Sequence, residues 1–144
     1  MRRFHMTRPV GWITRFLLIA LLALPEATNR AAQHGFSLKE YDEFHDVLHP
    51  LEHEALPRKD FKRIRAKSGL LVRRGRAIVK GGVPQSMIGA RGEEFTKALK
   101  TFDVALTRFS SAARRGTNQQ LKTTYSAVHD SYEMLVALLR EQMR

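Results

Sequence analysis

Apolar residues recur at intervals of three and four in four successive stretches of the chain. This spacing is typical of amphipathic helices, and no stretch shows the alternation that predicts a half-buried strand. The predicted helices cover about residues 38–56, 58–80, 93–115 and 118–143. On the last of them, the steps from Leu121 to Leu139 are those of a coiled-coil seam.

Prolines and glycines divide these helices. Pro57 separates the first two, the Gly- and Pro-rich stretch 81–92 separates the second from the third, and Gly116 ends the third. Helices of similar length joined by mostly short links predict an all-α, up-down-up-down four-helix bundle over residues 36–144. In that topology the first and fourth helices are antiparallel neighbours.

Pro50 lies inside the first predicted helix. It has no N–H to donate to the preceding turn, so we expect a kink or a local opening there. Before that helix, Ser37 followed by Glu40 has the pattern of a capping box, and Thr117 or Asn118 can cap the fourth helix.

The N-terminus has the pattern of an export signal. Four arginines precede the apolar run Phe16–Leu24, and Pro25 with several small residues follows it. A basic region before so short an apolar run is typical of a secretory signal, and the run is too short to span a membrane. We expect residues 1–30 to be a signal peptide and disordered N-terminus. The remainder should be periplasmic, with no stable membrane insertion after signal removal.

The amino-acid composition and the charge distribution exclude several classes of binding site and partner. The chain has no cysteine, which excludes disulfides, thiolate metal sites and covalently attached haem. Its net charge is +11, with ten bases and one acid at residues 58–80 but six acids and one lysine at residues 38–54. We interpret this as complementary neighbouring helices with a solvated basic face. No nucleic-acid motif is present, so we expect no nucleic-acid partner.

Three histidines in the first predicted helix indicate a metal site. His45, His49 and His53 follow one another at intervals of four, which places them on one face of a helix. His129 lies at the height of His45 if the first and fourth helices are antiparallel. We predict that His45, His49 and His129 bind one divalent transition metal ion, which could be Zn, Cu, Ni or Co, because imidazole suits these metals.

A carboxylate would complete this site. Glu133, one turn beyond His129, or Glu52 on the first helix is the expected ligand, whereas His53, nearer the end of the bundle, is expected outside the coordination sphere. The alternative interpretation is that these histidines are ordinary surface residues.

The segment YSAVHDSYEML, Tyr125–Leu135, resembles the haem-attachment segment of bacterial cytochromes c-prime. In that family of exported four-helix bundles, the fourth helix carries Cys-x-x-Cys-His. Here Tyr125 and Val128 occupy the cysteine positions, and His129 matches the iron-ligand histidine. Without the cysteines, the resemblance implies one of two cofactors. One is haem b held by His129 and a histidine of the first helix, and the other is a bare ion, as in periplasmic metal-sensor bundles.

The bare ion is favoured over haem because Tyr125, Val128 and the interior phenylalanines fill the volume that a porphyrin would need. A third class is a periplasmic chaperone-like helper without a cofactor, which would need an apolar surface left over from the bundle. Ser110 and Ser111 have no paired base and no glycine-rich phosphate loop occurs, so we expect no enzymatic activity. The sequence is also compatible with a homodimer.

Overall fold

The computed structural model describes residues 38–89 and 91–142. Four α-helices make up this part of the chain, namely α1 (Leu38–Pro50), α2 (Phe61–Gly81), α3 (Gly92–Arg115) and α4 (Asn118–Gln142). A π-helical turn, Leu51–Ala55, continues α1, and a short 3-10 turn, Gln85–Met87, lies between α2 and α3. The predicted signal peptide and the predicted Ser37 cap lie outside the described residues.

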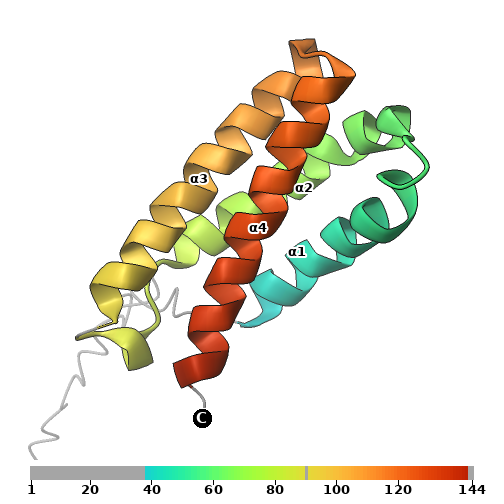
Figure 1. Ribbon diagram of the computed structural model, residues 1–144. Coiled ribbons are helices and arrows are strands. Elements are labelled where there is room, and N and C mark those ends of the chain that lie inside the picture. The colour runs from blue at the N-terminus through green and yellow to red at the C-terminus, as the bar shows by residue number, and fades with distance from the viewer. Residues whose placement is uncertain (1–37, 90, 143–144) are drawn as a thin grey trace, which may run out of the picture.

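Each helix packs against the next one along the chain, as Figure 1 shows. The all-α fold of four sequential helices, predicted from the apolar stripes, is therefore confirmed, and the arrangement is consistent with an up-down bundle. The centre of the core consists of fully buried aromatic rings: Phe44, Phe95, Phe102, Phe109 and Tyr125. No helix within the described ranges is both long and apolar enough to cross a membrane.

Pro50 disturbs the first helix at the predicted place. Because proline has no N–H, the regular ladder cannot continue through it, and the next turn opens to bonds between residues five apart. Leu56 N donates to Leu51 O at 2.9 Å, and Asp60 N donates to Ala55 O at 2.8 Å. The predicted opening is confirmed, and as a result the α-helical part ends at Pro50 rather than near residue 56.

Side-chain caps set the starts of two helices. The Asp60 carboxylate accepts a hydrogen bond from Arg63 N at 3.0 Å, so α2 begins at Phe61, slightly later than predicted. At α4, Gln120 N donates to Thr117 Oγ1 at 3.2 Å, and Thr117 N donates to Gln120 Oε1 at 2.8 Å. This reciprocal pair is a capping box, and it identifies Thr117 as the cap.

The Arg65 guanidinium ties α2 to the end of α3. Its Nη1 donates to the carbonyl oxygens of Ala112 and Ala113 at 3.0 and 2.8 Å. Its Nη2 donates to Gly116 O at 2.8 Å and to Asn118 Oδ1 at 3.2 Å. The last carbonyls of a helix lack partners within the helix, and a cation also suits the negative end of the helix dipole. A single side chain therefore holds the α3–α4 turn.

Two tyrosines connect α1 to α4. Tyr125 OH donates to Leu48 O at 3.0 Å, and Tyr132 OH donates to Tyr41 O at 3.1 Å. The two donors and the two acceptors have the same separation along the chain but opposite order, so α1 and α4 are antiparallel with a defined register. The backbones of α1 and α4 remain farther apart than those of sequential helices, and the long tyrosine side chains span the gap. We call this contact the α1–α4 seam.

Candidate functional site

The histidine row of α1 lies on the solvent side of the bundle. His45, His49 and His53 are all exposed. The ring centroids of His45 and His49 are 5.2 Å apart, and those of His49 and His53 are 4.3 Å apart. The predicted row of histidines spaced four residues apart is therefore present as three adjacent imidazoles. The His53 ring, on the π turn, lies closer to the His49 ring than the His45 ring does.

His129 occupies the same stripe of α4 as the two tyrosines of the seam. It lies four residues after Tyr125 and three before Tyr132, and residues at these spacings share one side of a helix. The register of the two tyrosine hydrogen bonds places His129 opposite Phe44, one residue from His45 along α1. The two helices thus present His129 and His45 at nearly the same height of the seam.

Ring contacts extend the seam toward the histidine row. The His45 ring stacks on the Tyr132 ring with centroids 6.3 Å apart and an interplanar angle of 29°. His129 is partly exposed, with 31% of its side chain accessible, and its Nδ1 lies 3.1 Å from Asp130 Oδ1. In this position the His129 ring is held by its chain neighbour and not by α1.

The two predicted carboxylate ligands differ in their surroundings. Glu133 is exposed on α4, one turn beyond His129. Glu52 is half-buried in the π turn, and its Oε2 is buried without a hydrogen-bond partner. Burial raises the pKa of the Tyr125 hydroxyl well above its usual range, and the Glu52 carboxylate nearby raises that pKa further. Glu52 therefore faces Tyr125 at the inner side of the seam, and not only the exposed histidines.

Among the described side chains, no three histidine, aspartate or glutamate residues already stand together as ligands for one metal ion. The structure brings His45 next to His49 and places His129 at nearly the height of His45. It leaves Glu133 exposed on α4 and Glu52 half-buried near Tyr125. Convergence on one ion would require His129 to leave Asp130 and rotate toward α1. The exposed His45 and His49 rings can change rotamer within picoseconds to nanoseconds, whereas the His129 ring must first leave its contact with Asp130.

Sequence reasoning missed two features of this region. Nothing in the spacing of His53 indicated that the π turn would bring its ring within 4.3 Å of His49. The inward Glu52 was also missed, although a glutamate two residues after a helix-interior proline lies where the face of the helix is expected to shift.

Comparisons with protein-family models, curated proteins and solved structures found no match to the chain.

Proposed function

We propose that this protein is an exported four-helix bundle that binds a divalent transition metal ion through His45 and His49 of α1 and His129 of α4. The observation that carries the proposal is the register of the α1–α4 seam. Two tyrosine hydrogen bonds fix that register, and it puts His129 within one residue of the height of His45. The adjacent His45 and His49 rings supply the other two imidazoles.

The filled seam supports a bare ion over haem b. Tyr125 is fully buried and donates to the backbone of α1, and Tyr132 contacts Phe44 with ring centroids 4.8 Å apart. A porphyrin between α1 and α4 would have to displace both tyrosines and their hydrogen bonds. The Tyr125–Leu135 segment thus resembles that of cytochromes c-prime in the position of its histidine, but its two tyrosines fill the space that haem would need.

The chemistry also fits a metal ion better than a cofactor-free chaperone-like helper. Within the described residues, the large apolar side chains that are exposed are Ile88, Val104 and Met134, which lie in the α2–α3 connection, in α3 and in α4. They form no continuous stripe along the bundle, which a helper for unfolded chains would need.

Calorimetric titration of the metal-stripped protein with Zn²⁺ and Ni²⁺ tests the proposal. We expect one ion per chain, no uptake by His129→Ala, and strongly weakened uptake by His45→Ala and His49→Ala. His53→Ala is the matched control, because it removes an exposed imidazole from the same row and should change little. Affinity should fall as the pH drops below about 6.5, since imidazole binds metal only when it is neutral.

One outcome would assign the metal ion to a different set of histidines. If His53→Ala loses binding while His129→Ala keeps it, the ion is held by the π-turn end of α1 alone. A Soret band in protein isolated from its host would instead establish haem.

A further inference from the structure

The outer face of the α2–α3 hairpin is strongly basic. Because each helix packs on its successor and tyrosines join α1 to α4, this face lies on the opposite side of the bundle from the histidine row. Helix α2 contains no acidic residue. The exposed cations of the two helices that form no ion pair with the described residues are Lys62, Lys67, Arg73, Lys80, Lys97, Lys100, Arg108, Arg114 and Arg115. The exposed acids of these helices, Glu93 and Glu94, both lie in the first turn of α3.

Internal ion pairs neutralise three of the other bases of α2. Arg63 pairs with Glu54 at 2.8 Å, Arg74 pairs with Glu43, and Arg76 pairs with Asp103. The charge complementarity of α1 and α2 predicted from the sequence therefore exists, but it uses only part of α2. In the described part of the chain, these nine exposed cations have no carboxylate partner within 4 Å, and their mutual repulsion is unfavourable in isolation.

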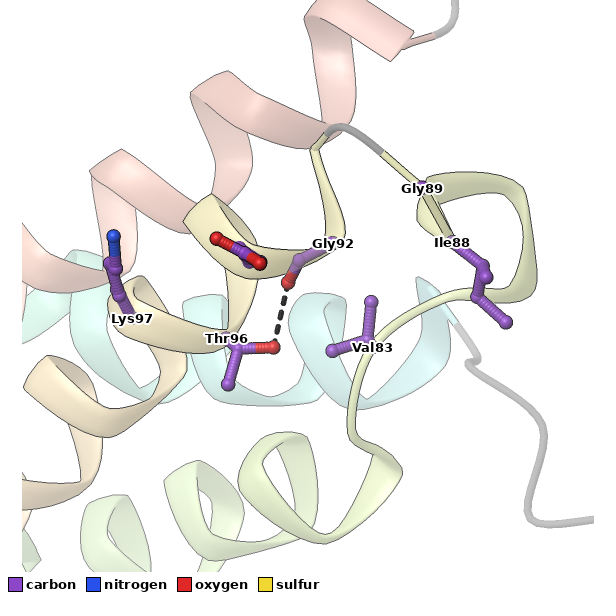
Figure 2. Close-up of a pocket in the computed structure, with 7 residues that line it drawn as sticks. Val83, Ile88, Gly89, Gly92, Thr96 and Lys97 are labelled. Atoms are coloured by element: carbon purple, nitrogen blue, oxygen red, sulfur yellow. Dashed lines mark hydrogen bonds between the residues drawn. The ribbon is translucent and has the colours of Figure 1, made fainter.

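An apolar groove of about 460 Å³ lies at the end of this basic face. Val83 and Ile88 of the α2–α3 connection and Thr96 of α3 line it, together with one acidic and one basic residue of α3, Glu93 and Lys97 (Figure 2). The Thr96 hydroxyl already donates to Gly92 O at 2.6 Å, so it adds no free donor to the groove. Ile88 is 66% exposed in the loop and lies beside Val83 at this groove, so the apolar surface there extends beyond one side chain.

We propose that the α2–α3 face binds the surface of an anionic lipid bilayer. The lysines and arginines contact the headgroup phosphates, and Ile88, with the groove behind it, reaches the acyl boundary at the loop end. Basic side chains beside an exposed apolar tip are the combination that peripheral membrane binding requires. The binding is peripheral and does not involve the histidines, so this proposal and the proposed metal site are tested independently of each other.

The same observations disfavour a nucleic acid. The α3 phenylalanines are buried, and Phe61 of α2 is partly buried against the core, so the face offers no fully exposed ring on which a base could stack. Two helices side by side make a flat surface and not a single projecting helix that enters a groove. An apolar groove beside the lysines also has no role against a phosphate backbone.

A local fluorescence probe tests the proposal in the full chain. The chain has no cysteine, so Ile88→Cys can be labelled at one position with an environment-sensitive dye such as NBD. Vesicles containing roughly one-third phosphatidylglycerol should raise and blue-shift its emission at low salt, and neutral phosphatidylcholine vesicles should not. The control label at Met134→Cys, exposed on α4, should not respond. The probe also separates this face from the apolar run at residues 16–24, which could bind vesicles by itself.

Charge variants supply the second measurement. At about 1 kcal/mol per base near an anionic surface, each neutralised lysine should weaken partitioning roughly 5-fold. The pair Lys97→Gln with Lys100→Gln should therefore lose about 25-fold. The control pair, Lys122→Gln with Arg140→Gln, removes the same charge from α4 and should lose little.

Three results would overturn the proposal. The first is a label at position 88 that ignores anionic vesicles or responds equally to neutral ones. The second is an equal loss of vesicle partitioning for the two pairs of charge variants, which would mean that binding depends on net charge alone and not on the α2–α3 face. The third is binding of duplex DNA that depends on Lys97 and Lys100 in a protein that ignores vesicles, which would mark the face as a nucleic-acid surface.

Discussion

Replacing Arg65 by methionine should destabilise the bundle by releasing the turn between α3 and α4. Methionine keeps the apolar stem of the side chain but removes all four hydrogen bonds to the α3–α4 turn. Three of the four acceptors are backbone carbonyls at the end of α3. Ala112 O keeps a second donor, Gly116 N at 2.8 Å, whereas no later residue of the helix can replace the lost donor at Ala113 O and Gly116 O.

The magnitude follows from the partial burial of the contact. A hydrogen bond to a charged group contributes about 1.5–3 kcal/mol, and a cation at a helix C-terminus contributes up to about 2 kcal/mol in a partly buried setting. Water can reach some of the freed carbonyls, so the terms do not add fully. We therefore expect Arg65→Met to cost about 2–3 kcal/mol in the free energy of unfolding.

Urea denaturation followed by circular dichroism measures this cost. With an m-value of about 2 kcal/mol/M, the midpoint should fall by about 1–1.5 M. Arg65→Lys should lie in between, because it keeps the charge but not the planar fork. Arg73→Met is the matched control, since Arg73 is exposed on the same helix, and it should stay within about 0.5 kcal/mol. A loss below about 0.5 kcal/mol for Arg65→Met, or an equal loss for Arg73→Met, would refute the reasoning.

Two further predictions concern packing and pH. Gly75→Ala should destabilise by about 1–2 kcal/mol in thermal denaturation, since a Cβ there would lie 2.7 Å from both Leu106 methyl carbons. Gly69→Ala, which meets only ordinary contacts, should instead stabilise by up to about 1 kcal/mol, and the reverse order would contradict the close α2–α3 approach. Burial raises the pKa of Tyr132 to about 12 from its ordinary 10.0, so the folded state keeps a proton that the unfolded state releases. Stability should therefore be complete below pH 10 and fall as the pH rises toward 12, and Tyr132→Phe should flatten this decline in denaturation curves taken along an alkaline series.

The number and order of the helices could be predicted from the sequence because apolar periodicity reports directly on burial. Phe44, Leu48, Phe95 and Tyr125 occupy predicted stripe positions, and all four are buried. Pro50 could be identified as a disturbance because a missing N–H is a local property. The form of the disturbance could not, since a kink and a π turn differ only in how later residues find their acceptors.

The contacts between helices could not be predicted from the sequence. Arg65 is one of ten bases between residues 58 and 80, and only the packing of α2 on α3 brings it to the end of α3. The height of His129 relative to His45 was predicted from helix geometry, and the tyrosine register agrees with it. The rotamers of the histidines and the inward Glu52 depend on side-chain packing, which no spacing encodes.

Crystals of the zinc-loaded protein, with anomalous scattering measured at the zinc edge, test the central claim most directly. The account predicts one zinc peak per chain at the outer edge of the α1–α4 seam, with nitrogens of His45, His49 and His129 about 2.0–2.1 Å away. A peak held by histidines of α1 alone, with His129 still turned to Asp130, would contradict it.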